Sequence, residues 1–246
     1  MELAVLTSPA DTYRWRMGLR KTVTTWAGTT AARRAAPAVA ARGAQQFIGK
    51  AIDGFKGFPG AREVARKHLA KRRDVDRAIR DVIEQHVRLA GVQGFVTNLG
   101  GVVAMPVSIP ANIAGLAVLQ LRMTAAIAHL RGYDVADPRV RTAAMMALLG
   151  KDGVRSARRM PGIPESPHDL VSGIGELDPL VTEQLAAHVM SEFVARIGGK
   201  HATLVLAKRV PLVGGAVSAG IDALSTHSIG RYADRELPPR VMIERA

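Results

Sequence analysis

The chain of 246 residues contains no cysteine and few aromatic residues. The absence of cysteine excludes a disulfide scaffold, a zinc–thiolate site and a thiol nucleophile. Aromatic residues make up 4% of the sequence, whereas apolar residues make up 48% and include many alanines. This composition favours packed helices over a β-sandwich, and it is too aliphatic for a chain that is disordered throughout. The length allows one large domain or two small ones with a substantial core.

Acidic residues are scarce in the first part of the chain. None occurs between Asp11 and Asp53, and residues 1–90 hold 18 basic and 8 acidic side chains, which accounts for most of the total charge of +13. A basic segment of this kind attracts polyanions, either nucleic acid or anionic lipid headgroups. Nucleic-acid binding has no support beyond charge, because no zinc finger, recognition-helix pattern or series of stacking aromatics is present.

The first 45 residues form a basic arm in which Trp15, Leu19 and Trp26 recur at near-helical spacing between arginines. A basic helix with tryptophan on its apolar stripe is typical of an interfacial membrane helix. The alternative is that the arm is partly disordered and makes no such contact. The candidate membrane-contact residues are Arg14, Trp15, Arg16, Arg20, Lys21 and Trp26.

Charged residues are also absent from residues 89–121, a run of 33 positions. About 20 apolar residues can span a bilayer, so a transmembrane helix has to be considered. Pro106 and Pro110 break the run near its middle. Asn98 and Gln120 add polar side chains that would need partners in hydrocarbon. The run therefore predicts a helical hairpin, either buried in a soluble core, which we favour, or re-entrant and dipping into a membrane.

Apolar residues elsewhere recur at helical spacing between Gly and Pro residues, and sustained β-type alternation does not occur. We therefore predict an all-α fold, a helical bundle with two Gly/Pro-bent apolar helical hairpins. Asp74 and Asp137 are predicted helix N-caps, and Gly132 is predicted to follow the end of a helix. Residues 151–178 are rich in Pro and Gly and are predicted to be an irregular connection. The two glycines at 198–199 are predicted to break the helix that precedes them.

Two stretches resemble the signatures of the EcsC family. Residues 94–135 contain an apolar Gly/Pro run followed by LQLRM and IAHLRGYD, and residues 207–233 contain K-x-x-P-x-x-G-G followed by an aspartate. The resemblance extends over about residues 75–235. It implies a bacterial protein, encoded in the founding case beside an ABC transporter, with no established activity and no catalytic residues to carry over. We expect an EcsC-like all-α domain at 46–236, preceded by the arm at 1–45 and followed by a tail at 237–246.

Polar residues inside apolar segments are the candidates for ligand binding, because an unpaired buried charge costs several kcal/mol. Asp222 lies within VPLVGGAVSAGIDAL and is predicted to pair with Arg122 or Lys208. Such a pair would either tie two hairpins together or bind a polar head group at the end of an apolar cavity. The full set of candidates is Asn98, Gln120, Arg122, His129, Lys208, Asp222 and His227.

An alternative hypothesis is an all-α enzyme that acts on a lipid or isoprenoid diphosphate. Helical enzymes of this kind use carboxylates to hold magnesium over the diphosphate. Asp134 and Asp137 form D-x-x-D and Asp222 lies on another predicted helix, but no acid follows Ser225 at the required spacing. Magnesium would be the cofactor only under this alternative.

The leading expectation is a membrane-associated accessory protein that interacts with lipid or another hydrophobic ligand and needs no cofactor. Its expected location is cytoplasmic, peripheral to the inner face of the cell membrane. The expected partners are an anionic membrane surface or a hydrophobic ligand and, from the family resemblance, a transporter. Nucleic acid is not an expected partner.

Overall fold

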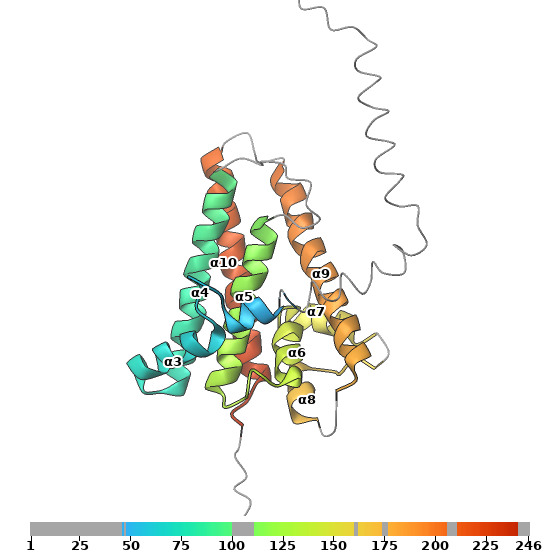
Figure 1. Cartoon of the computed structure of the whole chain (residues 1–246). Helices are drawn as coiled ribbons and strands as arrows, with labels where there is room; N and C mark the ends of the chain where they lie inside the picture. The colour runs from blue at the N-terminus through green and yellow to red at the C-terminus, as the bar shows by residue number, and fades with distance from the viewer. Residues whose placement is uncertain are drawn as a thin grey trace, which may run out of the picture. The chain divides into compact units, whose positions relative to one another are not determined.

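The computed structural model describes residues 46, 48–99, 111–159, 162–173, 177–205 and 211–240. The chain divides into two compact units, residues 1–43 and 44–246, and all described residues belong to the second unit. These residues form helices and turns with a single isolated β-bridge, which confirms the predicted all-α bundle (Figure 1). The six candidate membrane-contact residues of the arm lie outside the described residues.

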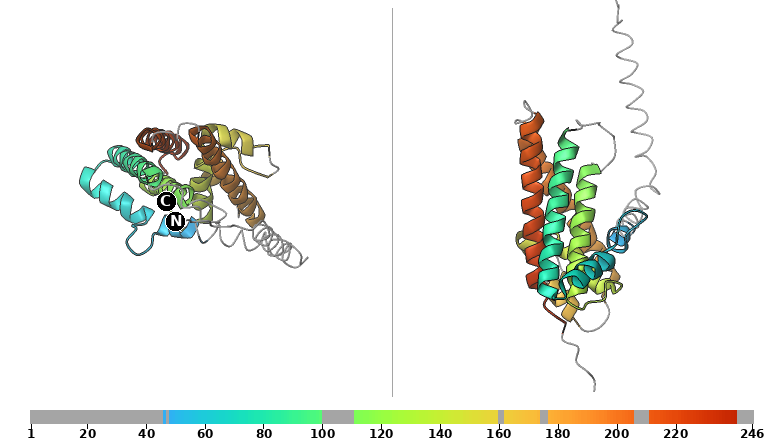
Figure 2. Two further views of the ribbon diagram at one scale, coloured as in Figure 1. Left: turned by 90° about the horizontal axis from the view of Figure 1, so that it is seen from above. Right: turned by 90° about the vertical axis from the view of Figure 1, so that its left-hand side faces the viewer.

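Three long helices run side by side: α4 (Val75–Leu99), α5 (Ala111–Leu130) and α10 (Pro211–Glu236) (Figure 2). Arg131, just after α5, fixes their relative directions. Its guanidinium donates to Asp76 at the start of α4 (2.8 Å) and to Asp234 at the end of α10 (2.6 Å). The C-terminal end of α5 therefore lies beside the N-terminal end of α4 and the C-terminal end of α10. As a result, α4 runs antiparallel to the other two helices.

Small residues allow α4 and α10 to approach each other closely. A Cβ atom placed on Gly230 of α10 would lie 2.9 Å from Cγ1 of Ile83 on α4 and 3.2 Å from the sulfur of Met123 on α5. Real Cβ atoms do not tolerate the shorter distance without a shift of their neighbours. Glycine at position 230 therefore sets the spacing at which the three helices meet.

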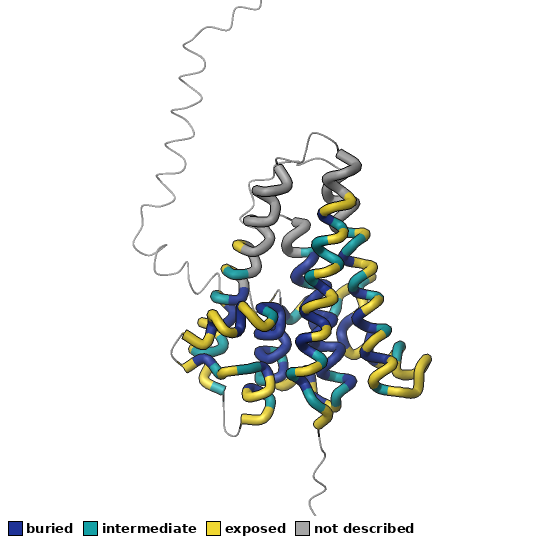
Figure 3. Tube along the Cα trace, turned by 180° about the vertical axis from the view of Figure 1, so that it is seen from behind, coloured by how far each residue is buried: buried dark blue, intermediate teal, exposed yellow. Residues whose placement is uncertain are grey.

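The remaining helices are α3 (Ala61–Arg72), α6 (Pro138–Ala147), α7 (Gly150–Ala157), α8 (Pro167–Ser172) and α9 (Pro179–Val205). The central one is α6, which packs against α5, α8 and α9 and has every residue from Thr142 to Ala147 buried. Figure 3 shows buried positions gathered in the middle of the unit and exposed positions on its outer faces.

Local signals in the sequence correctly predicted several helix ends. Asp74 accepts a hydrogen bond from the backbone N–H of Arg77 (2.6 Å), and Asp137 accepts one from Arg139 (2.8 Å), as helix N-caps do. Gly132 has a φ of 90°, the left-handed conformation that glycine adopts just past a helix C-terminus.

The irregular connection predicted for residues 151–178 is wrong at α7 and α8, which occupy about half of it. The side chains of Val154 and Ala157, three residues apart on α7, are buried, and Leu170 buries α8 in the same way. Ser166 caps α8 by accepting a hydrogen bond from the backbone N–H of Asp169 (3.2 Å). Burial of one face thus outweighs the poor intrinsic helix propensity of this segment.

The helix break predicted at residues 198–199 is also wrong, since α9 continues to Val205. A glycine inside a helix costs about 1 kcal/mol relative to alanine, which is not enough to interrupt a long helix. The bend of the first apolar hairpin, predicted at Pro106 and Pro110, lies outside the described residues. In the second hairpin the predicted turn at Pro211, Gly214 and Gly215 is wrong, because α10 begins at Pro211 and includes both glycines. In the part of the uncharged run whose side chains are described on α5, Leu116 and Leu121 are buried in the bundle. Among the helices that the structure describes, none has both the length and the hydrophobicity needed to cross a bilayer.

Candidate functional site

Arg122, the cation that interrupts the apolar helix α5, is 2% exposed. Its Nε donates to Nε2 of His86 on α4 (3.1 Å), and its Nη1 donates to the carbonyl of Pro59 (3.3 Å). Its guanidinium carbon lies 4.0 Å from the centroid of the Phe58 ring. These contacts make Arg122 a link between α5, α4 and the turn before α3. They do not include Asp222, and the other predicted partner of Asp222, Lys208, lies outside the described residues.

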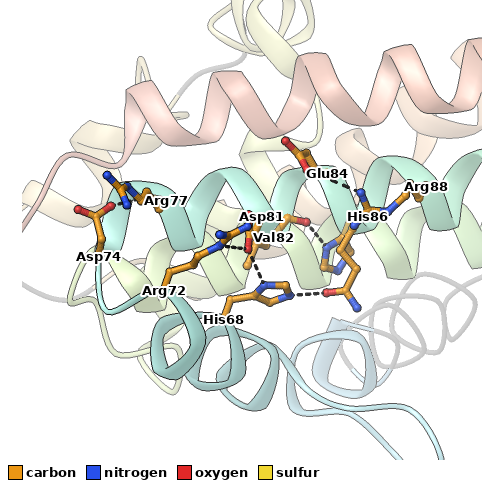
Figure 4. Close-up of polar contacts among 10 residues, drawn as sticks. His68, Arg72, Asp74, Arg77, Asp81, Val82, Glu84, His86 and Arg88 are labelled. Carbon is orange, nitrogen blue, oxygen red and sulfur yellow. Dashed lines mark hydrogen bonds and ion pairs between the residues drawn. The ribbon is translucent and has the colours of Figure 1, made fainter.

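His86 is the neutral acceptor that this arrangement needs. Its Nδ1 lies 2.7 Å from the carbonyl of Val82 (Figure 4). Nδ1 therefore carries the proton, and Nε2 is free to accept from Arg122. Burial, together with the positive charge of Arg122, lowers the pKa of His86 to about 3. Burial also lowers the pKa of Arg122 to about 10, which leaves it charged at neutral pH. The group is thus a structural link between α4, α5 and the turn before α3.

A second polar group joins α3 to α4 (Figure 4). Arg72 makes two hydrogen bonds to the carboxylate of Asp81, from Nε (2.6 Å) and from Nη2 (3.0 Å). The hydrogen bond from Arg72 lowers the pKa of Asp81, and the same contact raises the pKa of Arg72. His68 lies beside them, with its Nε2 2.7 Å from Oε1 of Gln85. These contacts fix the orientation of α3 on α4.

The other predicted ligand-binding residues do not converge on one site. Gln120 and Thr226 are both fully buried, and Nε2 of Gln120 donates to Oγ1 of Thr226 (3.0 Å), which ties α5 to α10. His129 is half-buried near the end of α5, where burial and the charges of nearby arginines lower its pKa. On α10, the side chain at 222 is half-buried and that of His227 is exposed. The Asn98 side chain and Lys208 lie outside what the structure describes.

The aspartates of the magnesium alternative have other partners. Asp134 accepts hydrogen bonds from the backbone N–H of Ala136 (2.9 Å) and from Arg62 (2.9 Å), and both interactions lower its pKa. Asp137 caps α6, and Asp222 lies within α10. Within the described ranges, no three His, Asp or Glu side chains are grouped closely enough to hold a metal ion. A magnesium-assisted activity therefore stays a prediction, and the geometry of the described residues does not favour it.

A surface groove between α7 and α10 combines charge with apolar walls. Its first part, the basic pocket, has a volume of about 400 Å³. The residues that line it are Lys151, Val154, Arg155, Arg158, Tyr232, Arg235 and Glu236. Four cations and one carboxylate thus face a single cavity. Such an excess of positive charge is typical of a site that binds an anion.

The hydrogen bonds around the basic pocket suit an anionic ligand. Nε of Arg158 donates to the carbonyl of Glu165 (2.6 Å), which holds this guanidinium in place. In the described part of the chain, none of the four cations forms an ion pair. Burial, reinforced by the charge of Glu236, raises the pKa of Tyr232 to about 12, so its phenol remains a hydrogen-bond donor at neutral pH.

The second part of the groove, the apolar pocket, has a volume of about 600 Å³ and shares Lys151 with the basic pocket. Its lining residues are Leu149, Gly150, Lys151, Asp152, Ile221, Leu224, Ser225, Ser228 and Ile229. Leu224 is 72% exposed, a large apolar side chain left open to solvent on the wall of a cavity. Together with Leu149, Ile221 and Ile229 it gives the pocket an apolar wall that suits the apolar part of a ligand.

The α7–α10 groove contains none of the seven residues predicted from the sequence. The prediction missed the groove because residues 151–178 were expected to be irregular. In an irregular segment the spacing of the cations does not predict that they lie on one face. As a helix, the segment places Lys151, Arg155 and Arg158 at intervals of four and three residues, on one face. That spacing was the available signal. The α10 side of the groove, with Tyr232 and Arg235, lies within a helix that was predicted.

Comparison of the chain with known proteins gives one positive result. The EcsC protein family matches residues 43–242, most of the 246-residue chain. Neither curated proteins nor solved structures gave a match. The match includes all the described helices and both walls of the α7–α10 groove. The chain therefore belongs to the EcsC protein family.

Proposed function

We propose that this protein is a membrane-associated accessory protein that binds an amphiphilic anion, a lipid phosphate, in the α7–α10 groove. The observation that supports the proposal is the meeting of the basic pocket and the apolar pocket at Lys151. One end of such a ligand is charged and the other is a hydrocarbon chain. The proposed site of action is the inner face of the cell membrane, reached from the cytoplasm.

The dimensions of the groove suit this class of ligand. Its α10 wall extends from Ile221 to Glu236, and at 1.5 Å per residue this is a length of roughly 22 Å. Arg155 and Arg235 would bind the phosphate through charge-assisted hydrogen bonds, which are stronger than neutral ones. Ile221 and Leu224 would cover the adjacent part of the chain, a contact that removes apolar surface from water.

Isothermal titration calorimetry with three probes tests this proposal on the full chain. Lysophosphatidic acid carries both phosphate and chain, inorganic phosphate carries only the head, and monoacylglycerol carries only the chain. Lysophosphatidic acid is expected to bind more tightly than either of the others, because only it fills both pockets. Equal binding of inorganic phosphate would identify an anion site without lipid specificity, and absence of binding by all three probes would contradict the proposal.

Two variants connect the binding to the groove. Arg155→Gln and Arg235→Gln each remove one charge-assisted hydrogen bond, so each is expected to weaken lysophosphatidic acid binding by roughly 10-fold or more. Arg159→Gln is the matched control, since Arg159 is an exposed arginine of the same segment that lines neither pocket. Equal affinities in all three variants would place the binding elsewhere.

A further inference from the structure

The surface formed by α3 and the turn before it is strongly basic. Residues 55–73 hold seven Lys or Arg side chains and one acidic side chain, a net charge of +6. Arg72 is paired with Asp81, and Arg62 is paired with Asp134. The remaining cations include Lys56, Arg66, Lys67 and Arg73, which are all exposed and form no ion pair with any described residue.

Two large apolar side chains are exposed among these cations. Phe55 is 54% exposed in the turn, next to Lys56, and Leu69 is 37% exposed on α3. Leu69 lies three residues after Arg66, so these two side chains are neighbours on the helix surface, and Arg73 follows the end of the helix. Ala61, Val64 and Ala65 form the buried face of α3, and Leu69, four residues after Ala65, lies at the border between this face and the basic one. Phe55 and Leu69 are therefore accessible to solvent beside the basic side chains.

The turn presents Phe55 in a fixed position. Phe55 and Phe58 form an isolated antiparallel bridge, and their rings stack with centroids 5.0 Å apart. Phe58 in turn lies against the buried guanidinium of Arg122. Gly54 and Gly57 have φ angles of 85° and 82°, a conformation that allows the tight turn. The stack connects an exposed ring to the core, so a contact made by Phe55 needs little further ordering of the chain.

We propose that this α3 surface, consisting of Phe55, Lys56, Arg66, Lys67, Leu69 and Arg73, docks the folded domain on an anionic lipid bilayer. Cations bind the headgroup charge, and aromatic and aliphatic side chains enter the boundary between headgroups and acyl chains. The alternative occupant of a basic face, nucleic acid, gives no role to the aliphatic Leu69 between two arginines. This inference rests on the proposed membrane association and names the surface that carries it, separate from the α7–α10 groove and from the basic arm.

The absence of cysteine provides a direct test, because a single introduced cysteine can carry a dye at a chosen position. Full-length Phe55→Cys and Leu69→Cys are labelled with the environment-sensitive fluorophore NBD, and Leu180→Cys is the control. Leu180 is 63% exposed on α9 and lies outside the α3 surface. Vesicles of phosphatidylcholine with phosphatidylglycerol are added, and vesicles of phosphatidylcholine alone serve as the uncharged comparison.

The expected result is a blue shift and an intensity rise at positions 55 and 69 with the anionic vesicles, and no change at position 180. Salt should reverse the change, because screening weakens exposed electrostatic contacts. The chain could also sediment with these vesicles while the fluorescence at positions 55 and 69 stays unchanged. That result would overturn the inference, because another segment would then bind the membrane. No sedimentation at all would contradict the proposed membrane association itself. A response to RNA but not to vesicles would also overturn the inference.

Charge variants give the size of the effect. Arg66→Gln removes one cation and is expected to lower the vesicle partition coefficient roughly fivefold, while Arg66→Glu reverses the charge and is expected to lower it roughly thirtyfold. Arg159→Glu is the matched control on an exposed arginine outside the α3 surface. Equal partitioning of the Arg66 and Arg159 variants would contradict docking through α3.

Discussion

The buried guanidinium of Arg122 stacks on the ring of Phe58, with its central carbon 4.0 Å from the ring centroid. Arg122 belongs to α5, and Phe58 belongs to the turn that leads into α3. A cation without a carboxylate partner is costly in the interior, and here the ring, the Pro59 carbonyl and His86 replace part of its hydration. The buried Arg122 is therefore connected through the Phe58 ring to the exposed turn that carries Phe55.

The neutral state of His86 makes stability depend on pH. Its pKa is lowered to about 3 in the folded chain, against 6.5 for an unperturbed histidine. Between these values the unfolded state binds more protons than the folded state, so stability falls as the pH falls through 6.5. Between about pH 7.5 and about pH 5, His86→Gln should lose roughly 2 kcal/mol less unfolding free energy than the wild type. Urea unfolding at both pH values measures the difference, and equal losses would show that His86 titrates normally in the fold.

The close approach at Gly230 predicts opposite effects of one substitution at two positions of α10. Gly230→Ala puts a methyl group 2.9 Å from Ile83, and this overpacking should cost about 1–3 kcal/mol, more than the helix-propensity gain of up to about 1 kcal/mol. Gly220→Ala meets nothing within 4 Å and should stabilise the chain by up to about 1 kcal/mol. Thermal or urea unfolding of both variants provides the comparison. Stabilisation by Gly230→Ala would mean that the helices are further apart than described.

The buried pair of Gln120 and Thr226 predicts a non-additive double-mutant cycle. Thr226→Val leaves the Gln120 amide without its acceptor and should cost about 1–3 kcal/mol. Gln120→Leu combined with Thr226→Val removes both polar groups and should cost less than the sum of the two single changes. Chemical denaturation of the four chains measures the coupling. If the losses of unfolding free energy in the two single variants add up to the loss in the double variant, the two side chains do not interact.

The phenol of Tyr232 is predicted to bind the anionic ligand of the α7–α10 groove. Tyr232→Phe keeps the buried ring but removes the hydrogen-bond donor, so lysophosphatidic acid affinity should fall by roughly 3- to 10-fold. Because the pKa of Tyr232 is raised to about 12, its hydrogen-bond contribution should not change between neutral pH and about pH 9. Calorimetry on both chains tests this, with thermal unfolding as the control for folding. An unchanged affinity would remove Tyr232 from the site.

The sequence predicted the fold class and the helix ends that depend on local chemistry. Asp74, Asp137 and Gly132 act within one helical turn, so their side chains or backbone conformations are enough to define a boundary. Where tertiary burial decides, as at Val154 in α7, the Gly and Pro content was misleading. The sequence also gave no sign that the partner of Arg122 would be a neutral histidine, because that contact depends on the packing of α4 against α5.

The groove could not be predicted from the sequence for a related reason. Its cations on α7 become a cluster only when the segment is helical, and they face Tyr232 and Arg235 only after α7 packs on α10. The polar residues inside apolar runs could be identified from the sequence, but those with described contacts connect helices to one another. Gln120 illustrates this, since it ties α5 to α10 and lines neither pocket.

Photo-crosslinking with a lysophosphatidic acid that carries a diazirine in its acyl chain tests the central claim most directly. The full chain is irradiated with the probe, digested, and the labelled peptides are mapped by mass spectrometry. We predict labels on the segments that line the apolar pocket, residues 149–152 and 221–229, and their loss when unlabelled lysophosphatidic acid competes. Labels confined to other segments, or labels that the competitor does not reduce, would contradict a lipid phosphate site in the α7–α10 groove.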